Sequence, residues 1–143
     1  MSPYRQLLVA LDLSADSRRI AEQCMALARP WQARVRLLHV IEFVPVEPMS
    51  DALVPVVQID DQVVARSRAQ LAELATAVGL DPAEAQVATG NVKSEILRQA
   101  RALGADLIVL GARERHGLSI LVNLTEDTVL HGAPCDVLAM RVR

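Results

Sequence analysis

"ADLIVLGA", residues 105–112, is the segment that constrains the fold most strongly. Its apolar residues follow one another without a polar interruption from Leu107 to Leu110. Such a run is typical of a central strand in a parallel sheet, because helices cover that strand on both faces. The segments on either side of it should therefore alternate between strands and amphipathic helices.

Four further segments have the composition of strands. They are RQLLVALD (5–12), ARVRLLHVIEF (33–43), EAQVAT (84–89) and CDVLAMRVR (135–143). The longer segments between the strands have helical periodicity and predict four helices. Five strands alternating with four helices indicate an α/β protein with one doubly wound, Rossmann-like parallel sheet and right-handed crossovers. The length of 143 residues corresponds to a single domain over residues 1–143.

Local signals mark the ends of the predicted helices. Ser14 is the expected N-cap of the first helix, over residues 13–31, and Asn91 is that of the third. The second helix should end at Gly79 and the third at Gly104. In the first two helices, the residues expected to face the core are Ile20, Cys24, Leu27 and Ala28, then Ile59, Val63, Val64, Leu71, Leu74, Ala75 and Val78.

Two other segments complete the predicted chain. The segment 44–56 carries three prolines and is expected to be irregular. It could cover the edge of the sheet as a lid or contact a partner, and its composition does not decide between these roles. The segment 126–133 is expected to be helical.

Composition argues against several classes of function. A net charge of −2 and only three aromatic residues, Tyr4, Trp31 and Phe43, disfavour nucleic-acid binding. No apolar segment approaches about 18 residues, so we expect no membrane association, no secretory signal and a cytoplasmic location. Cys24 and Cys135 fall in apolar segments and are expected to be buried free thiols.

Neither a metal site nor a catalytic site is predicted. His39, His116 and His131 share no metal-like spacing with one another or with acids, and His39 is expected to be a hydrogen-bonded histidine in the core or at the sheet edge. The sequence has no Gly-x-Ser-x-Gly motif and no Gly-Lys-Ser or Gly-Lys-Thr phosphate loop. We therefore expect the chain not to be an enzyme.

Several of these segments together resemble the universal stress protein family. VALDLS (9–14) and CDVLA (135–139) are the most specific of them, and the agreement in order and spacing extends over essentially the whole chain. The resemblance implies a five-stranded parallel sheet of order 3-2-1-4-5. It also implies a homodimer joined through the last strand.

Family members that bind ATP resemble one another in a glycine motif after the fourth strand: Gly-x-x-Gly, eight or nine residues, then Gly-Ser or Gly-Thr. Gly111 matches the first glycine, whereas the second falls on Glu114 and the final pair on Asn123-Leu124. Glycine lets backbone N–H groups approach a phosphate, and Glu114 adds bulk and negative charge there. At ~4 Å and an effective dielectric of ~20, a like-charge contact costs on the order of 4 kcal/mol, which Arg113 and Arg115 could offset. Alternatively, Arg113, Glu114 and Arg115 form a solvated loop, in which exposed ion pairs contribute little.

The start of the last predicted helix already carries acids. Asn123 and Glu126 have the spacing of a capping box, and Glu126 with Asp127 matches the positive end of the helix dipole. We therefore expect no cofactor and no dependence on ATP. If a nucleotide does bind, as ATP with magnesium, the resemblance assigns the site to Asp12, Val40, Gly111, Arg113 and Thr125.

Two of these residues have a second interpretation. Asp12 ends the first strand, where it either lies beside the ribose and phosphates, as in nucleotide-binding relatives, or turns the chain into the first helix with Ser14. Val40 either matches the apolar wall of the relatives' adenine pocket or is a core residue. Since parallel strands end at one edge, Asp12, Val40–Glu42 and the loop at Gly111 should lie on the same side of the sheet.

The last strand, Val137–Val142, should lie at a sheet edge, where unpaired backbone groups and apolar side chains favour pairing with a second copy. The residues and the resemblance together predict a non-enzymatic, cytoplasmic stress-response protein that acts as a homodimeric interaction or regulatory module without ATP. The alternative is an adenine-nucleotide-binding regulatory protein with a weakened phosphate loop.

Overall fold

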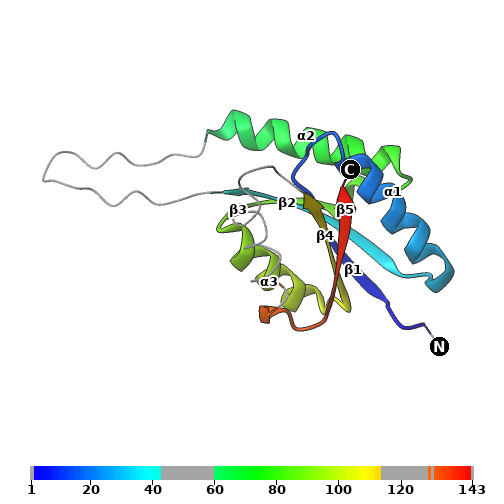
Figure 1. The fold of residues 1–143 in the computed structure, drawn as a ribbon. Helices are drawn as coiled ribbons and strands as arrows, with labels where there is room; N and C mark the ends of the chain where they lie inside the picture. Colours follow the sequence, from blue (N-terminus) through cyan, green and yellow to red (C-terminus); the bar gives the residue numbers. More distant parts are fainter. Residues whose placement is uncertain (1, 43–59, 114–128, 130, 143) are drawn as a thin grey trace, which may run out of the picture.

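The structure is a computed structural model that describes residues 2–42, 60–113, 129 and 131–142. One five-stranded sheet packs between helices on both of its faces (Figure 1). The strands are β1 (Gln6–Ala10), β2 (Arg34–Glu42), β3 (Ala85–Gly90), β4 (Leu107–Arg113) and β5 (Asp136–Val142). The longer helices described are α1 (Ser17–Ala28), α2 (Asp61–Ala77) and α3 (Val92–Leu103), and the 3-10 turns are η1 (Arg29–Trp31) and η2 (Pro82–Glu84).

The strands lie in the order β3-β2-β1-β4-β5, and each neighbouring pair is parallel. The predicted doubly wound sheet of order 3-2-1-4-5 is therefore confirmed. The direction of winding reverses at β1, because β2 lies on one side of it and β4 on the other. β5 is at one edge of the sheet, as predicted for the last strand.

β4 is buried on both faces, as its unbroken apolar run predicts. Leu107 and Val109 belong to the core cluster under α1 and α2, whereas Ile108 and Leu110 belong to the cluster under α3. All four are no more than 5% exposed. Figure 1 shows the corresponding layers, with α1 and α2 on one side of the sheet and α3 on the other.

α1 begins later than predicted. Its first helical residue is Ser17 and its N-cap is Asp16, so the assignment of Ser14 as N-cap is wrong. Ser14 lies in the turn before the helix, where its carbonyl oxygen accepts the N–H of Ser17 at 3.1 Å. The predicted core-facing side is right for the buried Ile20, Cys24 and Ala28, and Leu27 is half-buried.

The other predicted helix ends are confirmed. Asn91 caps α3 through its Oδ1, which accepts the N–H of Ser94 at 3.0 Å. Gly104 ends α3 with a φ of 61°, a left-handed conformation that glycine adopts without a Cβ clash. Asp60 caps α2 by accepting a backbone N–H of its first turn at 2.9 Å, and Gly79 follows the end of α2 with a φ of 82°.

The predicted core-facing side of α2 is only partly right. Leu71 and Ala75 are buried, but Val63 is 39% exposed and Ser67, at 8%, takes a buried position. These four residues follow one another at intervals of four along the helix. Val63 is the first of them and lies in the first turn of α2.

Val129, His131 and Gly132 are helical, in agreement with the helix predicted over 126–133. Val129 is fully buried in the cluster under α3. Gly132 lies close to α3, because a Cβ at this position would come within 2.9 Å of Leu97 Cδ1. Arg101 adds a hydrogen bond from its guanidinium to the carbonyl oxygen of Gly132 at 3.3 Å. This short helical segment is therefore attached firmly to α3.

Some predictions fall outside the described residues. They concern the segment 44–56, Ile59, His116 and the capping box at Asn123 and Glu126. Within the described ranges, no helix has the length and apolar character needed to span a bilayer.

Candidate functional site

The carboxyl ends of the strands form the edge at which a ligand site is expected in this fold. Register pairs Ala10 with Leu38 on β2 and with Leu110 on β4, so the residues that follow these three positions lie at one level. Asp12, Val40 and Gly111 are therefore brought to the same edge, as predicted. We call this edge the carboxyl edge.

The Asp12 carboxylate is held by donors from the start of α1. Its Oδ1 accepts the backbone N–H of Ser14 at 3.0 Å and the hydroxyl of Ser17 at 3.2 Å. Ser17 is 2% exposed, so its hydroxyl needs such a partner. These contacts favour the interpretation in which Asp12 turns the chain into the first helix. Sequence reasoning missed Ser17, whose only signal is its position five residues after the acid.

Leu13, between Asp12 and Ser14, has a strained backbone. Its φ is 58°, a left-handed conformation that costs a non-glycine residue about 1–2 kcal/mol. Its side chain packs against the core under α1 and α2, which offsets part of this cost. The hydroxyl oxygen of Ser14 is buried and has no hydrogen-bond partner among the described residues. Strain and an unpaired buried polar atom are both typical of functional edges.

His39 ties β2 to the segment that follows β1. Its Nδ1 lies 2.8 Å from the carbonyl oxygen of Leu11, and a carbonyl can only accept, so Nδ1 carries the proton. Close by, the N–H of Leu11 donates to the carbonyl oxygen of Leu38 at 2.8 Å. The prediction of a hydrogen-bonded histidine at this edge is confirmed.

The remaining candidate residues have different outcomes. Val40 is 8% exposed and packs in the cluster under α3, so it is a core residue. Gly111 is half-buried in β4 and pairs with Met140 of β5. The backbone of Arg113 ends β4, and Thr125 lies outside the described residues together with the rest of the candidate phosphate loop.

The two cysteines are free thiols of different exposure. Cys24 is fully buried, and burial raises the pKa of its thiol to about 12, so the reactive thiolate is scarce at neutral pH. Cys135 is only half-buried, which corrects the prediction that both would be buried. In the part of the chain that the structure describes, no three His, Cys, Asp or Glu side chains gather as a metal site requires.

The role of Asp12 can be tested through stability. If Asp12 holds the turn before α1, Asp12→Ala should lower the free energy of unfolding by about 1 kcal/mol, because two donors lose their acceptor. Asp12→Asn should retain most of the stability, since an amide oxygen can still accept both bonds. Urea denaturation of the three proteins measures this. A gain in stability on removing Asp12 would instead indicate a carboxylate kept for a ligand.

The sequence model of the universal stress protein family matches residues 3–141. The chain belongs to the universal stress protein family. Universal stress protein A homolog 2 of Coxiella burnetii is 33% identical to it over 144 residues, which cover 100% of this chain and 99% of the relative. The resemblance seen in VALDLS and CDVLA is thereby confirmed at the level of the family.

Solved structures of universal stress proteins share the fold of this chain. The universal stress protein UspA from Lactobacillus plantarum has a TM-score of 0.68 at 25% identity, over 96% of this chain and 98% of the other. A universal stress protein solved in complex with cAMP has a TM-score of 0.66 at 20% identity, over 96% of both chains. Because only 20% of the residues are identical, the similarity to the cAMP complex concerns the fold alone.

Proposed function

We propose that this universal stress protein acts in the cytoplasm as a non-enzymatic, homodimeric interaction or regulatory module that does not depend on ATP. The observation that carries this proposal is the loss of the family's phosphate-binding motif, in which Glu114 and Asn123 replace two glycines and Leu124 replaces the serine or threonine. A glutamate at the second glycine position obstructs and repels a phosphate, and the final Gly-Ser or Gly-Thr pair is absent.

The described part of the carboxyl edge supports the same proposal. The Asp12 carboxylate accepts two hydrogen bonds from its own chain. Val40 is packed into the core. Both positions therefore have structural roles that need no nucleotide.

Nucleotide content and titration test the proposal directly. The purified protein, after denaturation, should release no adenine nucleotide into the supernatant. Calorimetric titration with ATP and magnesium should give no saturable heat at micromolar concentrations. Copurified nucleotide, or micromolar binding, would contradict the proposal and favour the second candidate function.

The second candidate is an adenine-nucleotide-binding regulatory protein. It is favoured by the universal stress protein of the same fold that was solved with cAMP, and by the strained Leu13 beside the Ser14 hydroxyl, which has no partner in the described part of the chain. Its site would be made of Asp12, Val40, Gly111, Arg113 and Thr125. Parallel titrations with ATP, AMP and cAMP distinguish a site that needs the polyphosphate from one that needs only the nucleoside and one phosphate.

The proposed dimer forms through β5, whose outer edge has no neighbouring strand among the described residues. Ala139 is the middle residue of this strand and its side chain is exposed. In a two-fold arrangement the middle residues of both copies lie near each other. Ala139→Lys should therefore place two like charges together and raise the dimer dissociation constant about tenfold or more.

Sedimentation at several protein concentrations measures the change. Gln86→Lys is the matched control, because Gln86 is an exposed residue of β3, the strand at the opposite edge. It adds the same charge to an edge strand and should leave the dimer intact. A monomeric parent protein, or a dimer that only the Gln86 variant disrupts, would refute the β5 interface.

A further inference from the structure

A concave surface lies at the amino ends of the strands, opposite the carboxyl edge. It is a pocket of about 540 Å³ between the end of α1 and the edge strand β5. This volume is within the range of small-molecule sites. The side chains that matter for its chemistry are those of Tyr4, Leu27, Trp31, Leu107, Asp136 and Leu138. We call it the amino-end pocket.

Aromatic residues are concentrated in this pocket. The chain has three aromatic residues, and two of them, Tyr4 and Trp31, line it. Their ring centroids are 5.1 Å apart and the rings meet at 61°, an edge-to-face pair. The Ser2 hydroxyl contacts the carbonyl oxygens of both residues, at 2.7 Å and 3.3 Å. These contacts join the backbone segments that carry the two rings.

The polar groups of the amino-end pocket are negative. Tyr4 donates its hydroxyl hydrogen to Asp136 Oδ2 at 2.8 Å, which fixes an exposed carboxylate beside the rings. Asp106 lies near the same end of the sheet, where its Oδ2 accepts the backbone N–H groups of Arg5 and Gln6 at 2.7 Å and 2.9 Å. Burial raises the pKa of the Cys135 thiol, and the charges of Asp136 and Asp106 raise it further, so both acids act on the pocket wall.

Apolar side chains complete the wall of the amino-end pocket. Leu27, Leu107 and Leu138 provide the apolar remainder of the wall, and Leu27 and Leu138 are half-buried. The pocket thus combines an apolar floor, two aromatic rings and a carboxylate.

We propose that the amino-end pocket binds a small organic cation with a flat apolar body, of the aryl-alkyl ammonium class. The apolar body would lie against the three leucines, and the ammonium group would approach the Asp136 carboxylate and the face of the Trp31 ring. Carboxylate and aromatic face both attract a cation and disfavour an anion. The site is independent of the nucleotide question, because it lies at the other end of the strands. Its β5 wall adjoins the edge through which the proposed dimer forms, so binding is measured at protein concentrations above and below the dimer dissociation constant.

Trp31 makes the test direct, since it is the only tryptophan of the chain and it lines the pocket. Tryptophan fluorescence of the intact protein is followed during titration with 2-phenylethylammonium. A saturable change with a dissociation constant on the order of 1 mM is expected for a ligand of this size. 3-Phenylpropionate, with a similar body and the opposite charge, should bind at least about tenfold more weakly, and the neutral 2-phenylethanol should lie between them.

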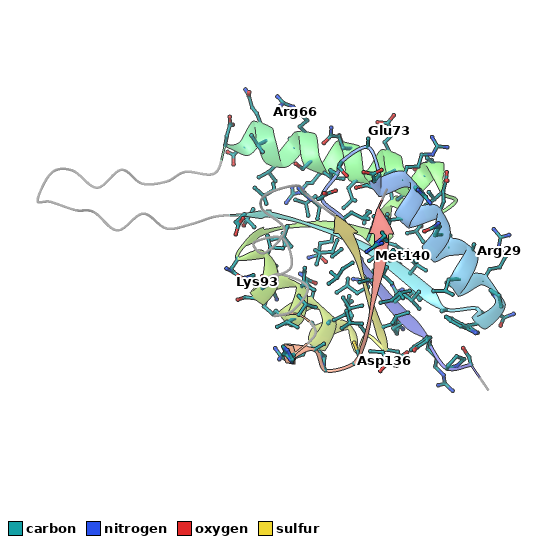
Figure 2. The ribbon with its side chains drawn as sticks, viewed as in Figure 1. Arg29, Arg66, Glu73, Lys93, Asp136 and Met140 are labelled. Atoms are coloured by element: carbon teal, nitrogen blue, oxygen red, sulfur yellow. The ribbon has the colours of Figure 1, made fainter. Side chains whose placement is uncertain are left out.

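Single substitutions test which residues of the pocket contribute to ammonium binding. Asp136→Asn should weaken ammonium binding about threefold to fivefold, in line with an exposed ion pair, and should abolish most of the preference over the carboxylate. Glu73→Gln is the control, because Glu73 is an exposed acid on α2, far from Asp136 in Figure 2, and should change nothing. Tyr4→Phe keeps the ring and should retain binding within about twofold.

Three outcomes would overturn the proposal. One is the absence of a saturable change with the ammonium compound. The second is equal binding of the ammonium and the carboxylate. The third is an equal effect of the Asp136 and Glu73 variants, which would mean that only net charge matters. Calorimetry with a Trp31→Ala variant provides a check that does not depend on fluorescence, and it should show binding lost.

Discussion

Restoring the family's glycine motif should create ATP binding in this chain. In Glu114→Gly combined with Asn123→Gly and Leu124→Ser, the affinity for ATP with magnesium should rise by about 100-fold or more over the parent, into the micromolar range. The variant regains backbone N–H groups that can approach a phosphate and loses one negative charge. It also gains a hydroxyl where the nucleotide-binding relatives have one. Calorimetric titration of both proteins measures the gain.

An alanine version of the same variant separates the two causes. Changing the same three positions to alanine removes the charge and the bulk, but it does not give the backbone freedom of glycine. We expect it to recover only a small part of the affinity. Equal binding by the alanine and glycine versions would show that charge alone blocks the site. No gain in either version would show that the loop is not where this chain differs from its nucleotide-binding relatives.

Ile108→Ala should have the largest effect on stability. Ile108 is fully buried in the cluster under α3, and its strand is paired with β1 on one side and β5 on the other. Removing most of this side chain should lower the free energy of unfolding by about 3–4 kcal/mol, because lost burial and a cavity add together. For a domain of this size, the melting temperature should fall by about 8–12 °C. Thermal and urea denaturation measure both quantities.

Val63→Ala is the matched control for this prediction. Val63 is a β-branched residue on α2 that is 39% exposed, so little burial is lost there, and alanine favours the helix. The change should stay within about 0.5 kcal/mol of the parent. A large loss at Val63 would mean that this residue is covered as the sequence pattern predicts, contrary to the structure.

The sequence predicted the fold best where a structural feature depends on the local preference of a single residue type. Apolar residues without interruption in β4 require cover on both faces, and this strand lies inside the sheet. Asn91 supplies an acceptor at a helix start, and Gly104 supplies a left-handed residue at a helix end. In each case the chemistry is local, so no knowledge of distant contacts is needed.

The carboxyl edge was predicted less completely, because its details depend on contacts between segments. Ser14 has the chemistry of an N-cap, but Asp12 takes its backbone N–H, and the helix starts at Ser17 instead. Leucine gives no signal for a left-handed residue, so the strain at Leu13 was not predictable. The position of Asp12, Val40 and Gly111 at one edge was predicted correctly, because it follows from the parallel arrangement of the strands alone.

The amino-end pocket was not predicted at all. Tyr4, Trp31 and Asp136 are far apart in the sequence, and each is unremarkable in its own segment. They meet only because β5 lies beside β4 at the edge that faces the end of α1. A site of this kind depends on packing between helices and strands, which cannot be predicted from the hydrophobic periodicity of the sequence.

The close contact between Gly132 and Leu97 and the burial of Val129 fix the chain on the far side of the candidate phosphate loop. The segment that carries the phosphate motif in relatives begins where β4 ends at Arg113 and returns to the core at Val129. Its first end is held in β4, where the first motif position, Gly111, pairs with Met140 of β5, and its second end is held by the buried Val129. Between fixed ends, even a doubling of the length of a connecting segment costs only about 0.6 kcal/mol. We therefore expect changes in the length of this connection to alter the stability of the domain little.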